Sequence, residues 1–361
     1  MVEKDSRRNS GSSSDPPEST SADWLMVRLD EKAEARTQKL HSESIVVDSC
    51  NTAAMWDEDY ILNRLVPSGV NVIVKSVPDI GGYQETAPQL AKMFSWMRRF
   101  DEHITRAVSM ADIKSALPEG KISVIYGFQD CKPLDGNIDF LEIYYEMGIR
   151  VMQLTYNSRG YAGDGCLERN DGGLSNWGLK LVEKMNKLGM IVDLSHASSK
   201  TAAEILEAST KPVICSHSNC KALVNSPRNI EDDLVSRIAE TNGYIGVTTF
   251  LAMVSEDWNR TPSLDEVIDH VDHVVKIAGS HCVGFGLDLP EGLTSRGYQS
   301  FDFAHSYPSW EQHSKHLVRE IESVRQAINL TRVLVNRDYS DSQIQAILGN
   351  NFLRVLEEVV G

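Results

Sequence analysis

The sequence predicts one α/β domain folded as a (β/α)₈ barrel, also called a TIM barrel, and three observations support this fold class. Short apolar runs alternate with longer amphipathic runs along most of the chain. Eight of the short runs are apolar almost throughout, as parallel strands buried on both faces are. The length of 361 residues is enough for one barrel of about 250 residues with additions. A doubly wound open sheet is the alternative that the same alternation permits.

The eight predicted strands are bounded by polar residues or glycine. They cover residues 44–48, 70–74, 122–126, 151–154, 190–193, 212–215, 244–247 and 282–286. Helix signals lie between them. One predicted helix ends at Gly189, since glycine favours the left-handed conformation of a helix C-cap. Another begins after Ser263, an N-cap residue that is followed by Asp265 and Glu266 in the first turn.

Residues 1–22 are predicted to form a disordered tail, and residues 23–361 to form the single barrel domain. The tail contains almost no large apolar side chains, so it cannot bury enough surface to offset the entropy lost on ordering. Residues 290–315 follow the eighth predicted strand and are rich in polar and aromatic residues. A barrel places this segment at its active-site face, where we expect it to form a lid.

The composition indicates a soluble globular protein without a nucleic-acid or membrane partner. The net charge is −15, and an acidic surface repels nucleic acid and anionic lipid, so we expect neither as a partner. Six scattered cysteines without a CxxC pair favour reduced thiols. There is no apolar run of about 18 residues, no signal-peptide core and no tail for a lipid anchor. A cytoplasmic location is therefore predicted.

Two histidines close consecutive predicted strands, and an aspartate closes the last one. In a barrel enzyme, the residues at the carboxyl ends of strands reach the active site. His196 and His217 would then be close enough to share a metal ion, and Asp288 would accept the proton of a bound water. The alternative is that each histidine is a hydrogen-bonded structural residue. Asp193 is expected to orient one of these ligands.

Four segments in a fixed order carry a family resemblance that covers nearly the whole folded chain. They are GDGCLERNDGGLSNWGLKLVEKMNKLGMIVDLSHAS, PVICSHSNCKALVNSPRNIEDDLV, HVDHVVKIAGSHCVGFGLDL and ILGNNFLRVLEEV. Together they resemble the membrane dipeptidase (peptidase M19) family. The resemblance implies a barrel related to the amidohydrolases, a binuclear zinc centre and hydrolysis of dipeptides, with some members accepting β-lactams. It also favours a homodimer, because relatives are commonly dimers.

The resemblance assigns roles to four residues. His196 and His217 match the two histidine ligands of the second metal, and Asp288 matches the acid on strand eight. Arg228 matches the arginine that binds the free carboxylate of the substrate, for which a guanidinium fork is suited. Without the resemblance, Arg228 is equally well explained as a loop arginine in a surface ion pair.

The sequence departs from the family at the other ligands. The His-x-Asp of strand one falls on Cys50 and Thr52, and the bridging glutamate falls on Gln129. A further histidine of strand four falls on Tyr156, and the Asp-Phe-Asp-Gly after strand eight reads DLPEG. Replacing an aspartate by threonine and a glutamate by glutamine removes two negative charges from a site for two dications.

The remaining donors favour one metal ion, zinc or another divalent metal, held by Gln129, His196 and His217. Cys50 is a further candidate ligand if it ionises, but its neighbours favour a buried, inert thiol. Tyr156 either donates a hydrogen bond to an oxyanion or only packs.

Acidic residues in the loop after the fourth strand also have two interpretations. Asp164, Glu168 and Asp171 either shape specificity or serve only to solvate the loop.

We expect a metal-dependent hydrolase that acts on a dipeptide or similar small amide with a free carboxylate. Two alternatives stay open. The chain is a relative recruited to another small-molecule reaction, such as elimination, condensation or cleavage of a conjugated metabolite, or it is a non-catalytic binding protein.

Overall fold

The computed structural model describes residues 26–54, 56–78, 81–295 and 307–361. The predicted tail lies outside these ranges, as do residues 296–306 of the segment expected to form a lid. Among the described residues, no helix is long and apolar enough to cross a membrane.

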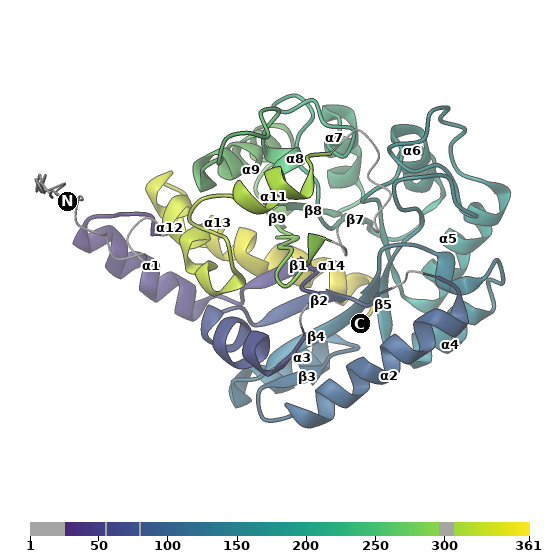
Figure 1. Ribbon diagram of the computed structural model, residues 1–361, viewed down its shortest axis with the longest axis horizontal. Helices are drawn as coiled ribbons and strands as arrows, with labels where there is room; N and C mark the ends of the chain where they lie inside the picture. The colour runs from purple at the N-terminus through teal and green to yellow at the C-terminus, as the bar shows by residue number, and fades with distance from the viewer. Residues whose placement is uncertain (1–25, 55, 79–80, 296–306) are drawn as a thin grey trace, which may run out of the picture.

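Parallel strands form a nearly closed barrel in these ranges, and helices surround it (Figure 1). Each strand pairs with the next one along the barrel. In order, they are β1 (Val47–Asn51), β2 (Val72–Ser76), β4 (Ile122–Phe128), β5 (Ile149–Gln153), β6 (Ile191–Asp193), β7 (Ile214–Cys215), β8 (Tyr244–Val247) and β9 (Val283–Phe285). The predicted barrel is confirmed, and the doubly wound alternative is excluded.

The helices mostly alternate with the strands, as parallel connections require. Those between the strands are α2 (Tyr83–Arg99), α3 (Met110–Ala116), α4 (Phe140–Glu146), α5 (Asn176–Leu188), α6 (Ser199–Ala208), α7 (Asp232–Glu240), α8 (Leu251–Val254) and α9 (Leu264–Ala278). Those outside the barrel strands are α1 (Glu31–Glu43), α11 (Trp310–Lys315), α12 (Ile328–Asn336), α13 (Asp341–Gln345) and α14 (Asn351–Val359). The predicted caps form: Gly189 ends α5 with φ of 76°, and Ser263 and Glu266 make a capping box on α9.

Two details differ from the predicted strands. A short extra strand, β3 (Ile104–Arg106), pairs with β4 outside the barrel path. It is too short to produce an alternation that can be seen in the sequence. The first barrel strand begins at Val47 rather than Ser44 and continues into polar residues as far as Asn51, with an irregular register between Asp48 and Asn51.

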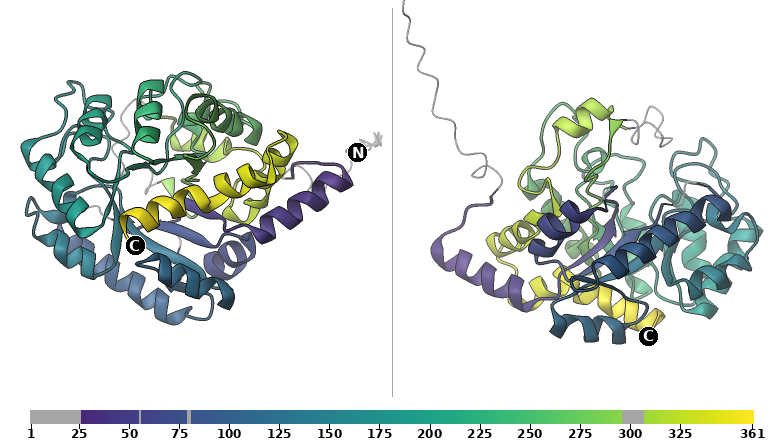
Figure 2. Two further views of the ribbon diagram at one scale, coloured as in Figure 1. Left: turned by 180° about the vertical axis from the view of Figure 1, so that it is seen from behind. Right: turned by 60° about the horizontal axis from the view of Figure 1, so that its bottom comes forward.

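The core fills the space between barrel and helices and also the inside of the barrel. Inward side chains such as Val47, Val72 and Tyr244 pack against α14. The ring of Phe352 on α14 meets the ring of Tyr244 edge-on, with centroids 5.4 Å apart. Figure 2 shows α14 and α1 lying across the same side of the molecule. The C-terminal helix therefore helps to close the barrel interior and leaves the carboxyl ends of the strands to the site.

Side chains and loop residues close the gap between β9 and β1. The backbone N–H of Asp288, in the loop after β9, donates to the oxygen of Cys50 in β1 at 3.0 Å. Ser49 Oγ donates to the oxygen of Phe285 at 3.0 Å. The carboxylate of Asp48 accepts from the N–H of Leu287 at 2.8 Å. Burial raises the pKa of Asp48 to about 6, despite these hydrogen bonds.

Replacing Gly286 by alanine should destabilise the barrel by about 1–3 kcal/mol. A Cβ at this position would overlap the backbone oxygen of Ser216 and lie 2.8 Å from Oγ of Ser49. Urea unfolding of Gly286→Ala measures the loss. Gly160→Ala is the control, because the nearest atom to its Cβ would be 4.0 Å away. Equal stability of the two variants would contradict this account of barrel closure.

Asp48 should make stability fall as the pH rises from about 4 to 6. Its pKa in the folded chain is about 6, above the unfolded value of about 3.9, so ionisation costs more in the folded state. The cost is complete above pH 6 and amounts to about 3 kcal/mol. Asp48→Asn keeps an acceptor oxygen and cannot ionise. The stability of wild type minus that of Asp48→Asn should therefore decline through this window, and a difference that does not change with pH would contradict the assignment.

Candidate metal centre and substrate cavity

The imidazole rings of His196 and His217 face each other at the carboxyl ends of β6 and β7. Their Nε2 atoms are 3.0 Å apart, and both residues are buried. His196 has a positive φ of 68°, which is uncommon for a residue other than glycine. Such strained backbone is found where the surrounding structure fixes a functional side chain. The two predicted ligands therefore lie together.

One carboxylate fixes the backbone on both sides of this pair. Asp193 Oδ1 accepts from the N–H groups of Ser195 and Ser216, each at 2.9 Å. Gln153 Nε2 donates to the other carboxylate oxygen at 3.1 Å. The N–H of His217 donates in turn to Ser195 Oγ at 3.1 Å. Asp193 thus positions both strand ends, in line with its predicted supporting role.

The outer nitrogens of the two rings are also occupied. His196 Nδ1 lies 2.8 Å from Oδ1 of Asn157, and His217 Nδ1 lies 2.8 Å from Oγ of Ser216. Since an amide oxygen only accepts, His196 donates its Nδ1 hydrogen and turns the lone pair of Nε2 toward His217. Burial, followed by the positive charge of Arg228, lowers the pKa of both histidines well below the ordinary value.

These neutral rings fit a metal ion. A hydrogen or a cation must lie between the two Nε2 atoms, because bare lone pairs at 3.0 Å repel each other. Two imidazoles on a tetrahedral zinc ion have nitrogens about 3.4 Å apart, close to the separation seen here. The hydrogen bonds at both Nδ1 atoms are the kind that orient metal-binding histidines.

The opposite side of the site carries weak, uncharged ligands at two of the replaced positions. Gln129 Nε2 donates to Sγ of Cys50 at 3.5 Å, so two of the replaced ligand positions contact each other. Burial, and then the charges of Asp288 and Asp48, raise the pKa of the Cys50 thiol well above its ordinary value. Among the described residues, no group of three or more His, Cys, Asp or Glu side chains is arranged to hold a metal. These donors do not fit a second dication.

Asp288 lies in the loop that follows β9, with a positive φ of 51°. Its carboxyl group is hydrogen-bonded to the side chain of Thr52. Burial raises the pKa of Asp288 to about 7, although the hydrogen bond from Thr52 and the charge of Arg228 oppose this shift. The group is thus able to exchange a proton near neutral pH.

Arg228 is buried and directs its guanidinium group into the site. Nη2 donates to the backbone oxygen of His217 at 3.1 Å, and Nη1 donates to Oγ of Ser218 at 3.3 Å. Within the part of the chain that the structure describes, no carboxylate forms an ion pair with it. The surface ion pair considered from the sequence is therefore absent there. A buried cation of this kind is suited to an anionic ligand.

A cavity of about 290 Å³ joins most of these residues. Gln129, Tyr156, His196, Arg228 and Asp288 all line it, whereas His217 and Cys50 lie behind its wall. The Tyr156 ring stacks on the His196 ring, with centroids 4.0 Å apart. The rest of the wall is largely apolar and includes Trp56, Val77, Pro78, Met93, Trp96, Phe250, Met253 and Leu293. The cavity therefore combines a few polar side chains with a largely apolar wall, as pockets for small molecules do.

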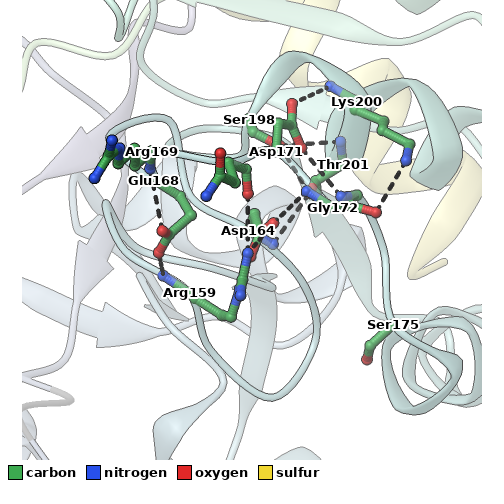
Figure 3. Close-up of polar contacts among 12 residues, drawn as sticks. Arg159, Asp164, Glu168, Arg169, Asp171, Gly172, Ser175, Ser198, Lys200 and Thr201 are labelled. Carbon is green, nitrogen blue, oxygen red and sulfur yellow. Dashed lines mark hydrogen bonds and ion pairs between the residues drawn. The ribbon is translucent and has the colours of Figure 1, made fainter.

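The acidic residues of the loop after β5 order that loop and do not line the cavity (Figure 3). Asp164 accepts from Arg159 Nη2 at 3.0 Å. Asp171 accepts from Ser198 Oγ at 2.7 Å and from the N–H of Lys200 at 3.0 Å, at the start of α6. These residues therefore do more than solvate the loop, and a role in specificity stays a prediction.

The same loop also supports the metal site. The N–H of Cys166 donates to the oxygen of His196, and that of Leu167 donates to the oxygen of Asn157. The ordered loop thus fixes the backbone of two residues of the metal site.

Sequence reasoning missed Lys75. It is a lysine at the end of an otherwise apolar strand, and it lines the cavity. Its place in the run VIVK was the available signal, because a charged residue that ends a buried parallel strand points to the site end of a barrel.

The fold and sequence have clear relatives. The dipeptidase aclJ of Aspergillus oryzae is 29% identical over 76% of this chain and 61% of its own length, and the dipeptidase verJ of Clonostachys rogersoniana is 28% identical over 76% and 65%. The chain spans less than two thirds of these curated relatives.

Solved structures agree with the fold. A crystal structure of an amidohydrolase from Pseudomonas aeruginosa has a TM-score of 0.83 and 29% identity, covering 90% of this chain and 99% of that one. The probable dipeptidase PvdM from the same organism has a TM-score of 0.75 at 21% identity, covering 92% and 99%.

The family model described as membrane dipeptidase (peptidase family M19) matches residues 34–360. This match spans the barrel strands and the C-terminal helix, and it includes the facing histidines, Arg228 and Asp288. The chain therefore belongs to the membrane dipeptidase family of hydrolases.

Proposed function

We propose that this protein is a hydrolase of dipeptides or similar small amides with a free carboxylate, and that it works with one metal ion. The observation that carries the proposal is the pair of facing imidazoles at 3.0 Å, of which His196 lines the same cavity as Arg228 and Asp288. His196 and His217 would hold the ion, and Gln129, which lines the same cavity, is the third ligand. Zinc suits this donor set, and another divalent metal is the alternative.

The chain's own residues have complementary roles in this proposal. When bound, the metal supplies Lewis acidity and lowers the pKa of a water molecule. Asp288 holds and releases a proton, because its pKa of about 7 makes both protonation states accessible near neutral pH. Arg228 binds the substrate carboxylate, and Tyr156 donates a hydrogen bond to the developing oxyanion. The largely apolar wall of the cavity limits the access of water to the reacting groups.

The loss of ligands on β1 and β4 favours one second candidate. With Cys50, Thr52 and Gln129 at these positions, the chain keeps Arg228 for substrate binding but lacks the negative charge that a second metal ion needs. Such a cavity suits a different small-molecule reaction, such as elimination, condensation or cleavage of a conjugated metabolite. A non-catalytic binding role is the third possibility, and product analysis separates it from the other two.

Two further expectations belong to the proposal, and they concern the cellular location and the assembly of the protein. All six cysteines are free in the described residues, which fits the reducing conditions of a cytoplasmic protein. A homodimer remains the expected assembly.

The number of metal ions per chain should distinguish a one-ion centre from a two-ion centre or a metal-free site. We expect about one equivalent of divalent metal per chain in the wild type, and its loss in the double variant His196→Ala, His217→Ala. Elemental analysis after gel filtration measures both. Cys50→Ala is the matched control, since its thiol stays protonated and its removal should leave the content unchanged. Metal retained by the double variant would contradict the assigned ligands.

Arg228→Met should weaken binding of substrates with a free carboxylate. The loss of a charged, bidentate hydrogen bond raises KM by roughly 10- to 100-fold. The C-terminally amidated form of the same substrate should show a much smaller change. Steady-state kinetics on the two substrates measures the difference, with melting temperatures to check folding of the variant. An equal loss on both substrates would show that Arg228 does not recognise the carboxylate.

A further inference from the structure

The substrate cavity has two ends that offer different side chains to a ligand. Arg228 follows β7, whereas Trp96 lies on α2, the helix that follows β2, and both residues line the cavity. Because β2 and β7 are the second and the sixth of the eight barrel strands, they lie on opposite sides of the barrel. His196 follows β6 and Asp288 follows β9, so these two residues flank the path from one end to the other. A ligand that spans the cavity therefore passes between them.

The wall at the α2 end is largely apolar. Its apolar side chains come from the segments after β1 and β2 and from α2 itself, and they are Trp56, Val77, Pro78, Met93 and Trp96. Met93 and Trp96 are three residues apart, so they lie on the same face of the helix. Burying an aromatic or aliphatic group of a ligand against such a wall is favourable.

Basic side chains outnumber acidic ones around the cavity. Among the lining residues that the structure describes, Asp288 carries the only carboxyl group, whereas Lys75, Lys92 and Arg228 are basic. The carboxyl group of Asp288 is hydrogen-bonded to Thr52 and exchanges a proton in the proposed reaction. The described part of the cavity therefore offers a positively charged ligand group no carboxylate at the α2 end.

The two lysines at this end do not make it a site for an anion. Lys75 Nζ donates to the backbone oxygens of Ala53 at 2.9 Å and Asn51 at 3.3 Å. The centroid of the Trp56 ring lies 5.6 Å from the same nitrogen. These contacts already stabilise the ammonium form of Lys75. Lys92 is exposed, so water solvates its amine. The α2 end therefore suits an uncharged group.

The amino group of a free dipeptide is poorly matched to these surroundings. It lies on the carbon next to the scissile carbonyl, so it enters the cavity whenever Arg228 binds the carboxylate and the carbonyl lies beside His196. An α-amino group has a pKa of about 7.7–8.0, so most of it is charged at pH 7. Burial of such a charge without a counter-charge is costly. A hydrogen in place of the ammonium group removes that cost and leaves the apolar contacts unchanged.

We propose that the preferred substrate is an N-acyl amino acid with an apolar, aromatic acyl group, rather than a dipeptide with a free amino group. Arg228 binds its carboxylate, and the acyl group packs against Trp56 and Trp96. Water adds its oxygen to the amide carbonyl carbon, and the C–N bond breaks. The acyl group leaves as a carboxylic acid, and the nitrogen takes a proton and leaves as the amine of the amino acid. This inference rests on the proposed hydrolysis and names its substrate class.

Two compounds that differ only in the amino group test the proposal. Phenylalanyl-alanine and 3-phenylpropanoyl-alanine share the ring, the amide and the carboxylate, but the second compound lacks the ammonium group. At pH 7 we expect kcat/KM for 3-phenylpropanoyl-alanine to be higher by about 10-fold or more. Release of alanine measures both values on the metal-loaded protein, with each enantiomer of alanine. An equal or higher kcat/KM for the free dipeptide would overturn the proposal.

A binding measurement separates this inference from the proposed function. If neither compound is hydrolysed, the proposed function fails, and calorimetric Kd values for the same two compounds decide the ligand class. Tighter binding of 3-phenylpropanoyl-alanine supports the inference, whereas equal, weaker or absent binding overturns it. A preference for succinyl-alanine over 3-phenylpropanoyl-alanine also contradicts it, because Lys75 or Lys92 would then bind an anion.

The variant Trp96→Ala tests where the acyl group lies. Trp96 is half-buried, so the helix should tolerate its loss. In the same measurement, the variant should lose about 10-fold on 3-phenylpropanoyl-alanine and less on acetyl-alanine, which has no ring to pack. Met97→Ala is the matched control, because Met97 is the next residue of α2 and does not line the cavity. An equal loss of Trp96→Ala on both compounds would show that the acyl group does not lie against α2.

Discussion

Two imidazole nitrogens that face each other at 3.0 Å in a buried site impose the main constraint on this structure. Buried polar atoms need partners, and here the partner must be a shared hydrogen or a cation. The surrounding groups act to hold this arrangement. Asp193 fixes the backbone of both strand ends, Asn157 and Ser216 orient the rings, and an ordered loop supports His196 and Asn157 from outside the barrel.

The two sides of the site offer different donors. On one side, the two neutral imidazoles have nitrogen lone pairs that suit a cation. On the other side, the Cys50 thiol and the Gln129 amide contact each other, and Lys75 adds a basic amine. The carboxyl groups nearest to Cys50 are those of Asp288 and Asp48, and burial raises the pKa of both. A second dication would therefore find little negative charge there.

Much of this architecture is visible in the sequence because it depends on local patterns. Continuous apolar runs indicate buried parallel strands, and the helix caps at Gly189 and Ser263 follow from side-chain chemistry. The grouping of His196 and His217 follows from topology, since neighbouring parallel strands end side by side. The separation and orientation of their rings could not be predicted, because these depend on contacts with Asn157 and Ser216 from other strands.

The features that sequence reasoning missed depend on long-range packing. β3 has three residues and forms only because β4 offers an edge. Lys75 resembles an ordinary strand-end lysine until the chain after β1 folds over it. Asp171 resembles a solvated loop residue, although its partners Ser198 and Lys200 lie up to 29 residues away in the sequence. In each case the deciding partner is distant along the chain.

The central claim is that changes on β1 and β4 removed one metal position and left the other intact. Restoring the lost ligands in the triple variant Cys50→His, Thr52→Asp, Gln129→Glu tests it most directly, with metal ions per chain measured by elemental analysis beside the wild type. The account predicts about one ion in the wild type and a second ion in the triple variant. Two ions already in the wild type, or no additional ion in a folded triple variant, would contradict it.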